Sequence, residues 1–174
     1  MNIRTGRTAL YGLLIALAFI FGYIETLIPV YLGAPGVKLG LANLVTIIAL
    51  YALGFLPAVW ISLARILLIG FTFGSMSTIL FSLAGAVLSL TVMWICRRFS
   101  LVDMVGASIL GGVFHNIGQF LVAAYVVRTF GVFSYMPGCS QRLLFAGTAA
   151  GGVIGLLGGM ILKRLRTALK DLER

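Results

Sequence analysis

The sequence has very few charged residues for its length. Asp, Glu, Lys and Arg make up 10% of the 174 residues, whereas they make up about 25% of an ordinary soluble domain. Hydrophobic residues account for 61% of the chain, and its mean hydropathy is +1.13. Because so little polar material cannot cover a water-soluble globule, the sequence predicts an integral membrane protein.

Acidic residues and histidine are scarcer still, and their scarcity excludes several chemistries. The four acids, Glu25, Asp103, Asp171 and Glu173, form no paired-carboxylate motif that would hold magnesium on a diphosphate. One histidine, His115, gives no histidine-based metal site. The two cysteines lie far apart and fit neither a disulfide framework nor a zinc spacing. With no Walker A motif and no Ser-His-Asp set either, we expect no catalytic residue, metal or cofactor in this chain.

Long apolar runs are what the sequence has in abundance, and they predict an all-α, polytopic membrane protein. A helix needs about 20 apolar residues to cross a bilayer core of about 30 Å. Gly54 suits a helix end and Pro57 suits a first helical turn, so we separate the second run from the third. The whole chain, residues 1–174, is then one transmembrane domain. Its six predicted helices cover residues 8–29, 39–55, 57–73, 75–96, 104–127 and 143–162.

The basic residues predict the orientation of these helices. The net charge of +9 lies in short clusters at the ends of apolar runs, which is typical of membrane proteins and argues against nucleic acid as a partner. Six crossings with a cytoplasmic amino terminus place both termini inside. The outer side then holds Lys38, Arg128 and Arg142. The inner side holds Arg4, Arg7, Arg97, Arg98, Lys163, Arg164, Arg166, Lys170 and Arg174.

A few polar residues fall inside the predicted spans, and such groups are costly in lipid, so each is a candidate ligand contact. Asn43 is near the outer end of the second span, and Arg65 is in the middle of the third. His115, Asn116 and Gln119 lie within two turns of the fifth span and can share one helix face. Together these residues predict a pocket that opens to the outside, with a polar floor.

The loops beside this pocket carry positive charge. Lys38 and Arg142 would form a basic rim, which favours an anionic or phosphate-bearing ligand. Other roles stay open: the polar floor can hydrogen-bond between helices, Arg65 can pair with Glu25 or with helix carbonyls, and the two rim residues can snorkel to the interface. The loop of residues 30–37 is either a lid over the site or a passive connector.

Four segments resemble a known protein family. One runs from Lys38-Leu39-Gly40-Leu41-Ala42-Asn43 to Gly54, and another is Gly111-Gly112-Val113-Phe114-His115-Asn116-Ile117-Gly118-Gln119. The remaining two are Ala64-Arg65 with Gly70 and Gly74, and Ser82-Leu83-Ala84-Gly85 with Ser89 and Met93. Over residues 8–162 the chain resembles the bacterial Gx transporter family, also labelled heptaprenyl diphosphate synthase component I. That family is similar to the S components of energy-coupling-factor transporters.

The resemblance implies a six-helix bundle like that of an S component, in the bacterial cytoplasmic membrane. Such a protein captures a micronutrient on the outside and docks onto a coupling transmembrane protein with two cytoplasmic ATPases. The implied ligand is small and resembles a vitamin, a flavin, or a prenyl or quinone precursor. Docking would use small residues of the first helix, Gly12 with Ala16 or Ala18 with Gly22, although ordinary helix packing also explains such pairs.

Two other functions stay open. The chain can be a non-catalytic membrane subunit associated with isoprenoid (heptaprenyl diphosphate) synthesis or with a redox complex. It can also be a stand-alone secondary carrier, which would transport its substrate without ATP.

Overall fold

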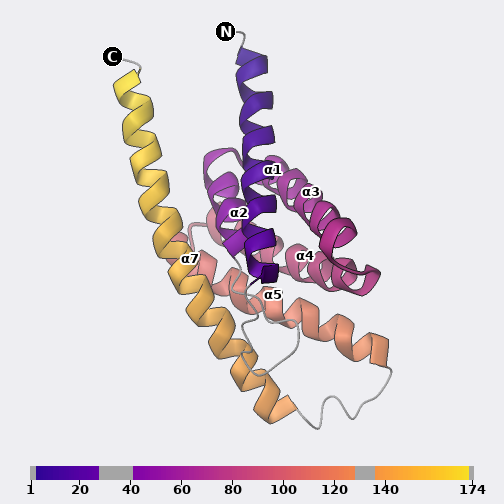
Figure 1. Ribbon diagram of the computed structural model, residues 1–174. Coiled ribbons are helices and arrows are strands. Elements are labelled where there is room, and N and C mark those ends of the chain that lie inside the picture. Colours follow the sequence, from indigo (N-terminus) through magenta and orange to yellow (C-terminus); the bar gives the residue numbers. More distant parts are fainter. Residues whose placement is uncertain (1–2, 28–40, 128–135, 173–174) are drawn as a thin grey trace.

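The computed structural model describes residues 3–27, 41–127 and 136–172, and these residues are almost entirely helical. The predicted all-α fold is confirmed for this part of the chain. Its six helices, in chain order, are α1 (Ile3–Leu27), α2 (Leu41–Ala52), α3 (Phe55–Phe73), α4 (Met76–Arg98), α5 (Met104–Val127) and α7 (Met136–Leu172) (Figure 1).

The observed helices follow the predicted ones in order, but α2 is shorter than predicted, and α1 and α7 differ most from the predicted ranges at their outer turns. The first helix begins at residue 3 instead of 8, and the last covers 136–172 instead of 143–162. Hydropathy marks only the apolar part of a helix. The added carboxyl-terminal turns of α7 are rich in Lys, Arg, Leu and Ala, which are strong helix formers, so the helix continues beyond its apolar part.

Among the described residues, four helices are long and apolar enough to cross a membrane. Their apolar stretches are Thr8–Glu25, Phe55–Phe73, Met76–Arg98 and Met104–Val122, and α2 contributes a shorter one, Asn43–Ala52. Stretches of this length imply contact with a lipid bilayer and support a multi-pass membrane protein. The number of six crossings stays a prediction.

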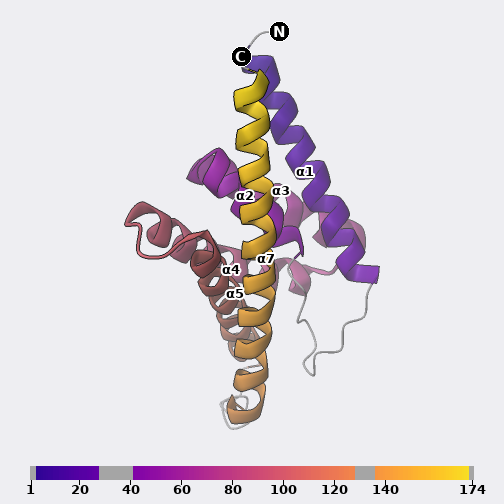
Figure 2. The ribbon, with the colours of Figure 1, turned by 90° about the vertical axis from the view of Figure 1, so that its left-hand side faces the viewer.

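The helices pack in two groups of three. In the first group, α1, α2 and α3 contact one another, and in the second, α5 packs against both α4 and α7. Contacts of α2 with α7 and with α4, and of α3 with α4, join the groups. Figure 1 shows α4 and α5 side by side, with α5 next to α7. In both views the first turns of α1 and the last turns of α7 lie at the same end of the molecule (Figures 1 and 2).

The short helix α2 lies at the centre of the core. All residues from 44 to 50 are buried, and Ala18 of α1 and Ile154 of α7 belong to the same apolar cluster. A helix that is buried on every side is apolar on every side, which explains why no polar stripe runs along α2.

A glycine turn separates α2 from α3, as predicted. Gly54 has φ 106°, a backbone conformation that glycine adopts readily and other residues rarely adopt. The helix α3 begins directly after it, with Pro57 in its first turn. At the carboxyl-terminal end of α2, near this turn, the Leu50 carbonyl accepts a hydrogen bond from Arg97, which lies at the end of α4. The Arg97 guanidinium also lies 5.5 Å from the ring centre of Tyr51.

Glycines let α5 approach both of its neighbours. A Cβ atom at Gly118 would lie 2.6 Å from the carbonyl oxygen of Ala84 on α4. A Cβ atom at Gly151 of α7 would lie 2.6 Å from the carbonyl oxygen of Ser108 on α5. Because backbone atoms cannot rotate away, these positions require glycine, and close approach of this kind is typical of membrane helices.

Candidate ligand-binding site

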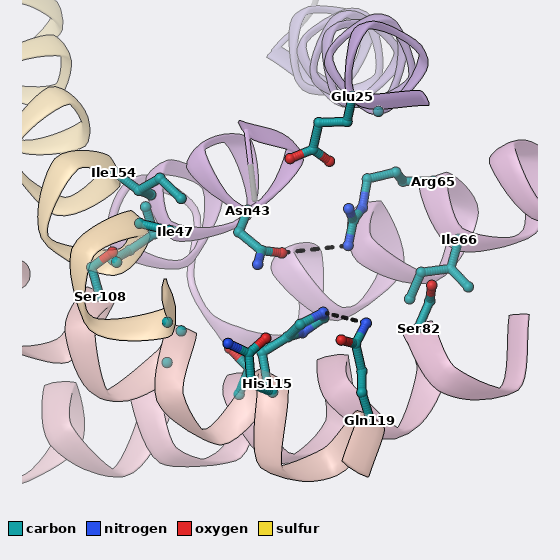
Figure 3. Close-up of a pocket in the computed structure, with 18 of the residues that line it drawn as sticks. Glu25, Asn43, Ile47, Arg65, Ile66, Ser82, Ser108, His115, Gln119 and Ile154 are labelled. Carbon is teal, nitrogen blue, oxygen red and sulfur yellow. Dashed lines mark hydrogen bonds between the residues drawn. The ribbon is translucent and has the colours of Figure 1, made fainter. Parts of the chain in front are cut away.

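A cavity is lined by residues from all six helices (Figure 3). Its empty space is about 890 Å³, including the part that opens to solvent. Its lining combines apolar walls with polar groups that converge from several helices, which is characteristic of ligand sites. The polar and charged lining residues are Glu25, Asn43, Arg65, Thr78, Ser82, Ser89, Ser108, His115, Asn116 and Gln119. The larger apolar ones are Ile47, Ile66, Ile69, Met93 and Ile154.

One side of the cavity carries a buried charge of each sign. Arg65 of α3 is 8% exposed and Glu25 of α1 is 9% exposed. The Glu25 side chain points toward the space between Asn43 and Arg65 (Figure 3), and its charge attracts that of Arg65. The Arg65 Nη2 atom donates to Asn43 Oδ1 over 3.5 Å, which is long for such a bond. Within the described residues, Arg65 Nε has no hydrogen-bond partner.

The other side of the cavity is formed by α5. His115 Nε2 and Gln119 Nε2 lie 3.3 Å apart, one helical turn from each other. Asn116 is buried and lies beside Gly147 of α7, where a Cβ atom would come within 2.8 Å of Asn116 Nδ2. All three residues line the cavity, while α4 and α7 pack closely against His115 and Asn116.

The structure thus brings five of the predicted site residues to one cavity: Asn43, Arg65, His115, Asn116 and Gln119. Lys38 and the loop of residues 30–37 lie outside the described residues. Arg142 belongs to α7, but its side chain is not among those described. The basic rim and the lid stay predictions.

The four predicted docking residues divide into two pairs. Gly12 and Ala16 are exposed on α1, and a Cβ atom at Gly12 would meet nothing within 4 Å. Ala18 is fully buried in the core, and Gly22 is buried and lines the cavity. Only the first pair is accessible to another protein in this structure, and its docking role stays a prediction.

Hydroxyl groups of α4 are cavity residues that sequence reasoning missed. Thr78, Ser82 and Ser89 all line the cavity from this helix. Their spacing of four and seven residues puts them on one helix face, and this periodicity was the signal available in the sequence. Glu25 is one of the polar residues in the predicted spans and a possible partner of Arg65; it is not among the predicted site residues, yet it lines the cavity.

A metal site would need several ligands close together. Across residues 3–27, 41–127 and 136–172, no three His, Cys, Asp or Glu side chains are grouped so that they could hold a metal ion. The polar groups around the cavity are amides, hydroxyls, one imidazole and one pair of opposite charges. Such groups are suited to hydrogen bonding with an organic ligand.

Comparison with known proteins identifies the family. Residues 14–161 match the family model described as heptaprenyl diphosphate synthase component I. No curated protein and no solved structure matches the chain. The matched residues include the central part of every described helix, together with the cavity. The chain therefore belongs to the heptaprenyl diphosphate synthase component I family.

Proposed function

We propose that this chain is the ligand-binding membrane component of a micronutrient uptake transporter, similar to an S component. The observation that carries the proposal is the cavity, to which every described helix contributes and where hydrogen-bonding side chains converge. Burying so many polar groups in a membrane protein is costly unless they have a function. A ligand with polar edges, held between apolar walls, provides that function.

The proposed topology has six crossings, with both termini in the cytoplasm and the cavity facing outward. The shared end of α1 and α7 supports it (Figure 1), as does the excess of Lys and Arg on the proposed inner side. Glu25 comes from the last turn of α1, and Asn43 from the first turn of α2. The cavity therefore lies toward the end of the molecule opposite the first turns of α1.

Energy for uptake would come from other chains. The sequence has no Walker A motif, so we propose partners of the energy-coupling-factor type, a coupling transmembrane protein and two cytoplasmic ATPases. In this scheme the chain itself catalyses no reaction. It captures a ligand resembling a vitamin, a flavin, or a prenyl or quinone precursor and delivers it when the partners act.

The test is to purify the full chain from membranes in mild detergent and identify any co-purified small molecule by mass spectrometry. The double variant His115→Ala, Asn116→Ala should lose that molecule. The matched control is Leu121→Ala on the same helix, since Leu121 is 52% exposed and does not line the cavity. Equal ligand content in the double variant and the wild type would remove the proposed site.

A second candidate is favoured by the description of the family, which is that of a synthase component. In this alternative the chain is a non-catalytic membrane subunit that holds a soluble isoprenoid synthase or a redox enzyme at the bilayer. Affinity purification after chemical cross-linking separates the two functions. Recovery of a coupling protein with ATPases supports the transporter component, whereas recovery of a synthase supports the scaffold.

A further inference from the structure

Arg65 presents an unused donor inside the cavity. The residue is buried and lines the cavity. Among the described residues, its side chain donates a hydrogen bond to Asn43 alone. An arginine side chain has five N–H donors, and Arg65 Nε is left without an acceptor there. A buried donor of this kind is costly unless an acceptor enters the site.

We propose that the ligand carries an oxyanion, a carboxylate or a phosphate, that binds Arg65 in place of Glu25. The proposal rests on the proposed function, because it concerns the same cavity. The Nε atom and one terminal nitrogen of a guanidinium form a planar fork that fits two oxygen atoms of a carboxylate or phosphate. A neutral amide or hydroxyl would accept from one donor and leave the charge of Arg65 to Glu25.

Glu25 is the acidic side chain that lines the cavity together with Arg65. It comes from α1, while Arg65 comes from α3, and both side chains are buried. Removing one charge of a buried pair leaves the other uncompensated, so Glu25 stabilises Arg65 when no ligand is present. An incoming oxyanion compensates the same charge and repels Glu25. Ligand and Glu25 therefore compete for Arg65.

The position of Glu25 suits a residue that must move. It lies in the last turn of α1, which ends at Leu27. Its helix contacts α2 and α3, whereas Asn43, His115 and Gln119 come from helices that pack in the centre or in the second group. Glu25 can leave Arg65 without disturbing the α4, α5 and α7 side of the cavity.

This competition predicts opposite changes in anion affinity when Glu25 and Arg65 are substituted. Glu25→Gln keeps the shape of the side chain and removes its charge, so it should strengthen binding of an anion by about tenfold, because like charges close together repel strongly in a partly buried site. Arg65→Lys keeps the charge but loses the fork, so it should weaken binding by at least about tenfold. The double variant Glu25→Gln, Arg65→Gln is charge-balanced and should show no preference for anions.

The probes are four molecules with one ring and different charges: benzoate, phenyl phosphate, neutral benzamide and cationic benzamidine. Each is titrated into the full-length protein in detergent, and the dissociation constant is obtained from the rise in melting temperature above that of the same variant without probe. Referring each variant to its own ligand-free state separates binding from any loss of stability. The double variant keeps the test valid if either single variant folds poorly.

The expected result is that one or both anionic probes bind more tightly than benzamide and benzamidine, with the two opposite effects of Glu25→Gln and Arg65→Lys. A difference between benzoate and phenyl phosphate identifies which oxyanion the site prefers. Equal binding of benzamide, tighter binding of benzamidine, or weaker anion binding by Glu25→Gln would overturn the inference. So would the absence of binding by all four probes. The proposed function is judged separately by the co-purified molecule, so the two failures are distinguishable.

Discussion

Gly85 of α4 makes room for the imidazole of His115 on α5. A Cβ atom at Gly85 would lie 2.7 Å from His115 Cε1 and 2.8 Å from His115 Nδ1. The imidazole in turn lies 3.3 Å from the Gln119 amide nitrogen. A residue without a side chain on one helix thus sets the position of two polar side chains on the next, and these border the cavity.

This relationship predicts that Gly85→Ala impairs ligand binding more than folding. The added methyl group meets the end of a side chain that can rotate, so His115 should turn away from its place beside Gln119. We expect the amount of co-purified ligand to fall by at least about fivefold, with a loss of stability of about 1 kcal/mol. Ligand content by mass spectrometry and thermal unfolding in detergent check the two effects. Gly159→Ala is the control, since a Cβ atom there would meet nothing within 4 Å.

At Gly118 and Gly151 we expect substitution to impair folding more than ligand binding. A methyl group at either position meets backbone carbonyl oxygens of the neighbouring helix, which cannot rotate aside. Gly118→Ala and Gly151→Ala should each cost about 1–3 kcal/mol through overpacking, seen as a lower melting temperature of the ligand-free protein. Melting temperatures equal to that of Gly159→Ala would show that the helices are not packed this closely.

Arg97 should stabilise the junction between α2 and α4. Its guanidinium donates to the Leu50 carbonyl near the carboxyl-terminal end of α2 and lies over the Tyr51 ring. Arg97→Ala loses a charged hydrogen bond and a cation–π contact, so we expect a loss of about 2 kcal/mol. The next residue, Arg98, is exposed, and Arg98→Ala should change stability by under about 0.5 kcal/mol. Thermal unfolding of the two variants side by side measures the difference, and equal losses would contradict the contact.

Asn43→Asp tests whether an oxyanion binds beside Arg65, because it introduces a carboxylate that is part of the protein. The substitution puts a carboxylate where an amide oxygen now accepts from Arg65, so it should compete with any bound oxyanion. We expect the protein to fold and benzoate to bind at least about tenfold more weakly than to the wild type. Asn43→Ala, which removes the acceptor without adding charge, is the comparison. Unchanged benzoate affinity in Asn43→Asp would mean that this probe does not bind beside Asn43.

The apolar runs predict the number and the order of the helices, and Gly54 and Pro57 predict the break between α2 and α3. The extra turns of α7 do not, because hydropathy says nothing of a polar helix end. His115, Asn116 and Gln119 were identifiable since polar groups stand out in an apolar span. Thr78, Ser82 and Ser89 share one helix face by their spacing, but this signal is weak, because single hydroxyl groups are common in membrane helices.

Which way a helix faces is the part that a single sequence does not contain. Ala18 and Gly22 have the spacing of a docking motif, yet they are buried within the chain. Gly12 and Ala16 have the same spacing and are exposed. The difference depends on where α2 and α3 pack against α1, and that arrangement joins residues distant in sequence. The same holds for Glu25, whose place in the cavity depends on the rotation of α1.

The division of the molecule into two groups of three helices has a practical consequence at the short connection between α3 and α4. Gly74 and Ser75 are the residues between these helices, and the peptide bond that joins them is the single covalent link between the groups. Two separate polypeptides, one ending at Gly74 and the other starting at Ser75, should therefore reassemble when they are produced together in one membrane. Because each fragment would contribute part of the cavity lining, ligand retention would show that the two fragments had assembled in the native arrangement.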